Sequence, residues 1–118
     1  MKKIIIVVAV VFISAFGFSQ NKNAKASLEV DGVCMMCKHR IEKACFSTKG
    51  VKSAIWDVKT HELKLIFDER KTNLKTIQNS VVAVGHDTKD LKAKDAIYNK
   101  IDPCCLYRDN KVVDDHKD

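Results

Sequence analysis

The chain has 118 residues, with 21 lysine and arginine side chains against 15 aspartate and glutamate side chains and a formal net charge of +6. This length is enough for one domain and too short for two. Acidic residues are interspersed among the lysines, without a basic stripe or an aromatic–basic platform, which argues against a nucleic-acid partner. Because five cysteines cannot all pair within one chain, at least one thiol has another role.

The first nineteen residues differ from the rest of the chain. Two lysines precede an uncharged, apolar run over residues 4–18, and small residues lie near its end. This order is typical of a secretory signal peptide, residues 1–19, with cleavage expected between Ser19 and Gln20. A membrane anchor is the alternative, but 15 residues at about 1.5 Å each fall short of the roughly 30 Å hydrocarbon core. We therefore expect an exported protein, periplasmic or secreted, that is not attached to the membrane after cleavage.

Residues 20–25 are polar and are expected to form a flexible linker. Apolar side chains then alternate with polar ones, as in a half-buried strand, at Ala26, Leu28 and Val30. A helix is predicted next, with one stripe formed by Cys37, Ile41, Ala44, Cys45 and Thr48. Gly50 suits a left-handed C-cap and is expected to end this helix.

A hairpin is predicted after this helix. The inward face of its first strand is formed by Ala54, Trp56 and Val58, and that of its second strand by Leu63, Leu65 and Phe67. Thr72 is then expected to cap a second helix that carries Leu74, Ile77, Val81 and Val84. Gly85 is expected to end that helix, and residues 86–91 are predicted to form a fourth strand.

The order strand, helix, strand, strand, helix, strand predicts an α+β domain over residues 26–91. We expect a ferredoxin-like βαββαβ sandwich, in which two helices cover one face of a four-stranded antiparallel sheet. Residues 92–108 form a C-terminal extension, with a short helix expected over residues 93–100 that docks through Ala96, Ile97 and Ile101. The charged residues 109–118 are expected to be a disordered tail.

Cys34 and Cys37 lie where the first strand passes into the first helix. Free backbone N–H groups and the helix dipole at such a junction are expected to lower the pKa of a thiol. Two thiolates can converge on one soft cation, and they suit Cu(I) or Hg(II) better than Zn(II), which takes four ligands. The alternatives are a thiol–disulfide oxidoreductase pair and a purely structural pair. The element order argues against the oxidoreductase, as does Pro103, the only proline, which follows the domain.

The segment Val-Asp-Gly-Val-Cys-Met-Met-Cys over residues 30–37, continued by residues 40–44 and 49–51, resembles the heavy-metal-associated domain. This family includes copper chaperones, N-terminal domains of copper-pumping ATPases and periplasmic mercury-binding proteins. The resemblance implies a ferredoxin-like fold, linear two-thiolate binding, and transfer of the ion to another metal-binding domain or a metal-transporting membrane protein. Two features depart from the family pattern Gly-Met-Thr-Cys-x-x-Cys. The loop before Cys34 is one residue shorter, and Val33 replaces the methionine that packs beneath the site.

Cys104 and Cys105 are candidate additional ligands. Adjacent cysteines are about 3.8 Å apart at Cα, less than the usual 4.4–6.8 Å of a disulfide, so a bond between them would be strained. They are better suited to holding an ion together or to reaching another sulfur. Joined to Cys34 and Cys37, they would provide four thiolates and favour Zn(II) or a multi-copper cluster. The alternatives are a disulfide between tail and domain, and surface thiols that dimerise the protein on oxidation.

Three other side chains have soft or titratable atoms near the motif. Met35 is expected at the loop tip, where its thioether can bind Cu(I). His86 begins the fourth strand and is expected beside the cysteine loop, partly exposed, as a third ligand, a screen for thiolate charge or a surface residue. Cys45 lies on the apolar stripe and is expected in the core. The sequence therefore predicts a non-enzymatic carrier, scavenger or detoxifier of Cu(I), with an adaptor protein as a weaker alternative.

Overall fold

The computed structural model describes residues 20–117 and begins with a strand, a helix and a hairpin. These are β1 (Ala24–Glu29), α1 (Met35–Phe46), β2 (Val51–Trp56) and β3 (Glu62–Phe67), followed by α2 (Leu74–Ala83). The extension contains α3 (Asp95–Tyr98), the 3-10 turn η1 (Pro103–Cys105) and α4 (Asn110–Asp115). Residues 1–19, the expected signal peptide, lie outside the described residues. None of the helices within residues 20–117 has the length and apolar character that a membrane crossing requires.

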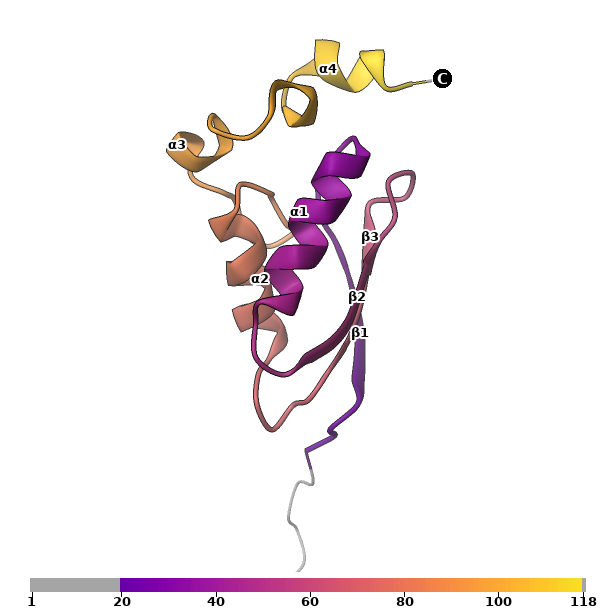
Figure 1. Cartoon of the computed structure of the whole chain (residues 1–118), viewed down its shortest axis with the longest axis vertical. Helices are drawn as coiled ribbons and strands as arrows, with labels where there is room; N and C mark the ends of the chain where they lie inside the picture. Colours follow the sequence, from indigo (N-terminus) through magenta and orange to yellow (C-terminus); the bar gives the residue numbers. More distant parts are fainter. Residues whose placement is uncertain (1–19, 118) are drawn as a thin grey trace, which may run out of the picture.

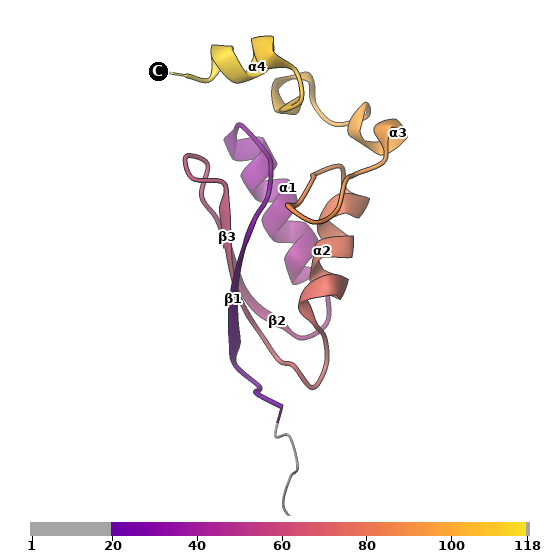
Figure 2. The ribbon, with the colours of Figure 1, turned by 180° about the vertical axis from the view of Figure 1, so that it is seen from behind.

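The sheet has the antiparallel order β1-β3-β2, with β3 in the centre. Leu65 of β3 lies opposite Ala26 of β1 and Ala54 of β2, so its side chain is at the middle of the sheet. The inward side chains of β3 are buried under the helices, as their alternation predicts: Leu63, Leu65 and Phe67. Both α1 and α2 cover this one face of the sheet (Figures 1 and 2). The predicted α+β, ferredoxin-like fold and the hairpin are thus confirmed.

The prediction of a four-stranded sheet is not confirmed, because the described residues contain three strands. Where the fourth was expected, a single antiparallel bridge joins Val30 to Thr88. The backbone turns away after this bridge, since the Thr88 N–H donates to the carbonyl of Leu91 and its hydroxyl donates to Gln78. The polar side chains of this segment therefore bind the protein locally instead of extending a ladder.

The helix ends differ in detail from the expected ones. The first helix ends at Phe46, and Gly50, with φ of +102°, lies in the turn before β2. The residue before α2 whose side chain caps it is Asn73, which accepts the N–H of Thr76, rather than Thr72. Asn is a better capping residue than Thr, and it stands directly before the first helical residue.

The core joins both helices to the sheet and contains Trp56, whose indole N–H donates to the Val30 carbonyl at 2.9 Å. Cys45 is fully buried there, and burial raises the pKa of its thiol to about 12. The expected role of Cys45 as a core residue is confirmed. Such a thiol is protonated at neutral pH and behaves as a small apolar side chain.

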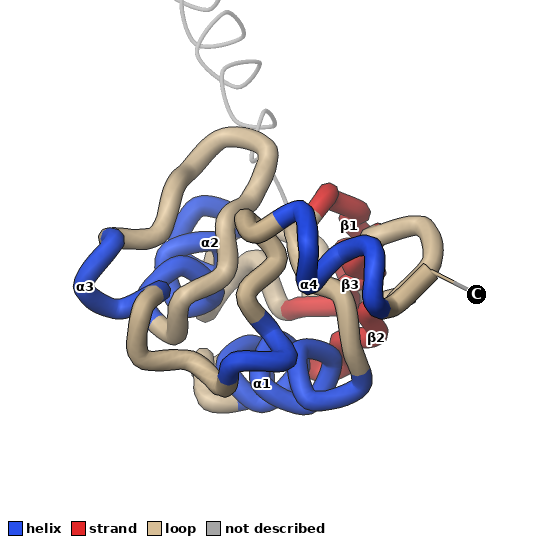
Figure 3. Tube along the Cα trace, turned by 90° about the horizontal axis from the view of Figure 1, so that it is seen from above, coloured by secondary structure: helices blue, strands red, loops and turns tan. Residues whose placement is uncertain are grey.

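The extension lies across the end of the domain at which α1 begins (Figures 1 and 3). The helix α3 is shorter than expected. The extension docks on the domain through buried Ala93 and Tyr98 and half-buried Ile97 and Ile101, whereas Ala96 is exposed. The prediction of a disordered tail is wrong for residues 110–115, because these residues form α4. The carboxylate of Asp109 caps this helix by accepting the N–H of Lys111.

Candidate metal centre

The cysteine loop is held in place by close packing at Gly32. A Cβ at this position would lie 2.9 Å from the Trp56 ring and 3.1 Å from the Cβ of Cys37. Only glycine therefore allows the loop to approach the ring without a shift of the neighbours. Cys34 follows in an extended conformation and is the N-cap of α1, where its sulfur accepts the N–H of Cys37. The Cys34 and Cys37 sulfurs meet on the first turn of the helix, 3.2 Å apart.

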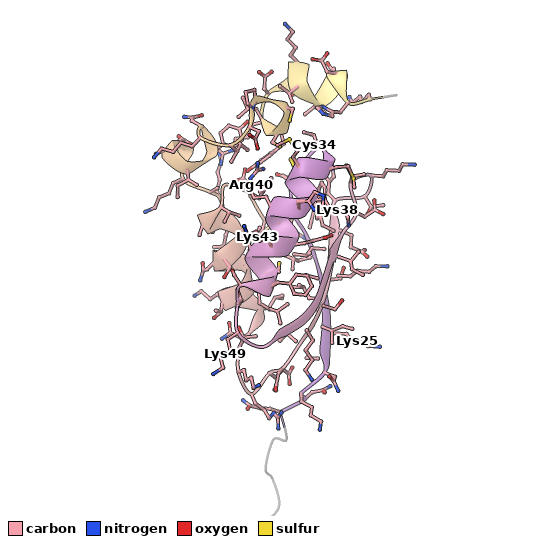
Figure 4. The ribbon with its side chains drawn as sticks, in the orientation of Figure 1. Lys25, Cys34, Lys38, Arg40, Lys43 and Lys49 are labelled. Carbon is pink, nitrogen blue, oxygen red and sulfur yellow. The ribbon has the colours of Figure 1, made fainter. Side chains whose placement is uncertain are left out.

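The extension brings two more sulfurs to this turn. The Cys105 sulfur lies 3.0 Å from that of Cys34, and the Cys104 sulfur lies 3.9 Å from that of Cys105. We call Cys34, Cys37, Cys104 and Cys105 the sulfur cluster. In Figure 4, Cys34 lies at the start of α1, directly beneath the extension. Three of the four members have sulfurs close enough to converge on one ion: Cys34, Cys104 and Cys105.

The members of the sulfur cluster differ in exposure. Cys37 and Cys105 are fully buried, Cys34 is half-buried and Cys104 is exposed. Burial is the largest influence on the Cys34 and Cys37 thiols and raises the pKa of each above its ordinary value. Backbone N–H groups at the helix start lower the pKa of both thiols, as expected, but the expected net lowering is wrong because burial has the larger effect. Desolvation of the thiolate outweighs the contacts that stabilise it, so a bound cation must displace thiol protons.

Of the two methionines in the motif, Met36 rather than Met35 contacts the cluster. The Met36 thioether lies 3.5 Å from the Cys104 sulfur, whereas the Met35 side chain is 57% exposed. This contact depends on the position of the extension, and no local sequence signal distinguishes the two methionines.

His86 lies beside the cysteine loop, as the topology predicted, but it is fully buried rather than partly exposed. One ring nitrogen faces the carbonyl of Asp31 at 2.8 Å, and the other accepts from Arg40 at 3.2 Å. The ring also stacks on Tyr107. Burial, together with the charge of Arg40, lowers the pKa of His86 to about 4. Both ring nitrogens already have hydrogen-bond partners, so neither is free to act as a metal ligand beside the sulfur cluster in this structure.

Arg40 is a site residue that the sequence reasoning missed. Its guanidinium donates to Asp102 at 2.6 Å and lies beside the Cys105 thiol. Burial lowers the pKa of Arg40, but the contacts with Cys105, Cys37 and Asp102 raise it above the ordinary value overall. The signal that could have found it is its position three residues after Cys37, one helical turn away on the same face.

Arg108 holds the extension to the domain. It donates two hydrogen bonds to the Asp87 carboxylate, at 3.0 and 2.7 Å, and its guanidinium lies 4.2 Å from the centre of the Tyr98 ring. Next to it, the Tyr107 hydroxyl donates to the carbonyl of Gly85 and accepts the N–H of Asp87. A two-bond arginine–carboxylate pair fixes orientation as well as distance, so the turn carrying Cys105 has a defined position.

Comparison with known proteins agrees with this fold and motif. The model of the heavy-metal-associated domain matches residues 27–87. The chain belongs to the heavy-metal-associated domain family. Copper chaperone CopZ of Staphylococcus saprophyticus is 28% identical to it over 67 residues, which are 56% of this chain and 98% of CopZ. The Cys104–Cys105 pair of the extension lies outside the residues that the family model matches.

Among solved structures, the heavy-metal-associated domain is similar to two transporter domains. One is the N-terminal domain of a potential copper-translocating P-type ATPase from Bacillus subtilis, solved in the Cu(I)-loaded state, with a TM-score of 0.54 and 25% identity over 64% of this chain and 95% of that one. The other is the N-terminal domain of the zinc(II) ATPase ZiaA, with a TM-score of 0.50 and 30% identity over 56% of this chain and 63% of that one.

Proposed function

We propose that this protein binds one soft metal cation, Cu(I), through the thiolates of Cys34 and Cys37, and serves as an exported carrier or scavenger. The observation that carries the proposal is the 3.2 Å approach of these two sulfurs on the first turn of α1, in a domain of the heavy-metal-associated family. The donors fit a soft d¹⁰ cation, because the atoms gathered at this turn are thiol sulfurs with a thioether beside them.

The choice of Cu(I) is supported by the relatives. CopZ is a copper chaperone, and the similar Bacillus subtilis domain was solved with Cu(I). Hg(II) favours the same thiolate pair, and the similarity to the domain of a zinc(II) ATPase makes Zn(II) the third candidate. Zn(II) would need four ligands, whereas Cu(I) is satisfied by fewer.

The raised thiol pKa values argue against the alternative of a thiol–disulfide oxidoreductase. In such enzymes the attacking cysteine has a lowered pKa and an exposed sulfur. Here burial raises the pKa of Cys34, which would be the attacking thiol, and its half-buried sulfur lies against those of Cys37 and Cys105. The partner that fits the proposal is another metal-binding domain or a metal-transporting membrane protein with soft ligands of its own.

An anaerobic Cu(I) titration against a competing chelator, followed by native mass spectrometry, tests the proposal. The reduced protein is expected to bind one Cu(I), and Cys34→Ser with Cys37→Ser is expected to abolish tight binding while the circular dichroism spectrum is retained. Cys45→Ala is the matched control, because this thiol is buried in the core and its loss is expected to lower stability only. Equal affinity in the parent and the double variant would refute the proposed function.

A further inference from the structure

The turn η1 places Cys105 among the residues of the motif, although 71 positions separate it from Cys34. The Cys105 sulfur is 3.0 Å from that of Cys34, and the Cys37 thiol donates to the Cys105 carbonyl at 3.9 Å. Cys105 is as deeply buried as Cys37, so its sulfur points into the protein rather than into solvent. Cys105 thus contacts both cysteines of the motif, Cys34 through its sulfur and Cys37 through its carbonyl.

We propose that Cys105 supplies a third thiolate to the ion bound by Cys34 and Cys37, which makes the site three-coordinate and closes it beneath the extension. The inference rests on the proposed function and adds a ligand to it. Binding transfers thiol protons to solvent and leaves the oxidation states of sulfur and of the cation unchanged.

The distances suit a three-coordinate site. Thiolates bound to a cation at about 2.3 Å lie about 4 Å apart when three of them surround it. The Cys34 sulfur is now 3.2 Å from that of Cys37 and 3.0 Å from that of Cys105. Each of these two pairs therefore needs to separate by about 1 Å or less, which side-chain rotation can provide without displacing a helix.

The charge around Cys105 also favours a thiolate there. Three thiolates and one Cu(I) carry a net charge of −2, which is costly to bury without a cation nearby. Arg40 provides that cation, since its guanidinium lies beside the Cys105 thiol and donates to Asp102 of the extension. The same side chain thus compensates charge at the sulfur cluster and anchors the segment that carries the third ligand.

Cys104 does not share this environment. It is exposed, its sulfur is 3.9 Å from that of Cys105, and its neighbour is the thioether of Met36. Although its sulfur lies within 4.8 Å of those of Cys34 and Cys105, its exposure leads us to assign Cys104 to the rim of the site rather than to the ion. Because Cys104 and Cys105 are adjacent, substitution of one provides a matched control for the other.

The extension has a consequence for ion release. An acceptor that takes the ion from Cys34 and Cys37 must also displace Cys105 and the turn that carries it. The protein is therefore expected to retain its ion longer than a two-thiolate site would. Ligand exchange with an acceptor becomes fast only when Cys105 is removed or the extension is released.

The experiment compares the purified parent protein, Cys104→Ser and Cys105→Ser, each reduced and loaded anaerobically with one equivalent of Cu(I). X-ray absorption at the copper edge is expected to count three sulfur ligands in the parent and in Cys104→Ser, and two in Cys105→Ser. Transfer of Cu(I) to an excess of chelator is expected to be at least about tenfold faster in Cys105→Ser, since even outer-shell substitutions at metal sites change affinity by that factor.

The parent protein alone can overturn the inference, so this arm of the test does not depend on the folding of a variant. Two sulfur ligands in the parent would overturn the inference and leave the proposed function standing. Three in the parent that fall to two in Cys104→Ser, but not in Cys105→Ser, would also overturn it. Absence of Cu(I) binding by the parent would refute the proposed function itself, and the inference with it.

Discussion

A chain of partly buried polar contacts connects the cysteine loop to the extension. The Asp31 carbonyl faces His86, His86 accepts from Arg40, and Arg40 donates to Asp102 and lies beside Cys105. Since the ring nitrogen that faces Arg40 must accept, the other nitrogen carries the proton and donates to Asp31. A neutral His86 with this tautomer therefore accepts from Arg40, whose guanidinium is also held by Asp102.

The protonation of His86 predicts how stability depends on pH. Its pKa is about 4 in the folded protein against 6.5 for an ordinary histidine, because burial disfavours the charged ring. As the pH falls, the unfolded chain takes up the His86 proton at a higher pH than the folded protein does. The contribution of neutral His86 to the free energy of unfolding is therefore complete above about pH 6.5 and is lost as the pH falls toward 4, by up to about 3 kcal/mol.

Urea unfolding of the reduced, metal-free protein between pH 4.5 and 7.5 measures this dependence. The free energy of unfolding is expected to decrease with falling pH in the parent and to decrease less in His86→Gln. Aspartates are common to both proteins, so the difference between the two curves isolates His86. Parallel curves would show that the pKa of His86 is the same in the folded and the unfolded chain.

At the scale of elements, the extension is ordered by polar contacts with the domain rather than by its own helices. Its helices α3 and α4 have 4 and 6 residues, and such short helices are not stable alone in water. What fixes them is the pair between Arg108 and Asp87, together with buried Tyr98. The position of Cys105 therefore depends on a salt bridge that lies outside the sulfur cluster.

Arg108→Ala is expected to release the extension from the domain. Removing one partner of a fully buried ion pair costs about 3–5 kcal/mol, and the cost here is expected to be smaller because the pair is partly exposed. Hydrogen exchange of residues 98–108 is expected to accelerate while that of α1 and β3 is unchanged, and Cu(I) transfer to a chelator is expected to become faster.

Arg70→Ala is the matched control for this experiment. Arg70 also donates two hydrogen bonds to one aspartate, Asp68, but it lies just after β3 and away from the extension. The substitution Arg70→Ala is expected to leave the hydrogen exchange of the extension and the rate of Cu(I) transfer unchanged from the parent protein. Unchanged protection of residues 98–108 in Arg108→Ala would show that the salt bridge does not hold the extension.

At the scale of the whole molecule, β1 begins at the end of the domain opposite the start of α1, where Cys34 lies (Figures 1 and 4). This arrangement is compatible with export before metal binding, which we propose from the charged and apolar pattern of residues 1–19.

Export predicts a mature protein that begins at Gln20. Cell fractionation with intact mass measurement is expected to find residues 20–118 in the exported fraction. Val8→Arg interrupts the apolar run and is expected to leave the uncleaved chain inside the cell. Recovery of the uncleaved parent chain in the cytoplasmic fraction would contradict the prediction, and recovery in the membrane would favour the anchor.

The sequence by itself determined the features that depend on neighbours along the chain. Side-chain period correctly predicted α1, α2 and three of the four expected strands, and the position of Cys34 and Cys37 at a strand–helix junction predicted the place of the motif. Local pattern also assigned Cys45 to the core. Each of these follows from the geometry of a single element, so no long-range contact was needed to infer it.

The tertiary structure decided the rest. The fourth strand is reduced to one bridge because Thr88 and its neighbours bind side chains and carbonyls nearby, and His86 is buried because Tyr107 of the extension stacks on it. The meeting of Cys105 with Cys34 depends in the same way on the salt bridge of Arg108. Contacts between residues this far apart in the chain arise only when separate elements pack together, so neither period nor spacing predicts them.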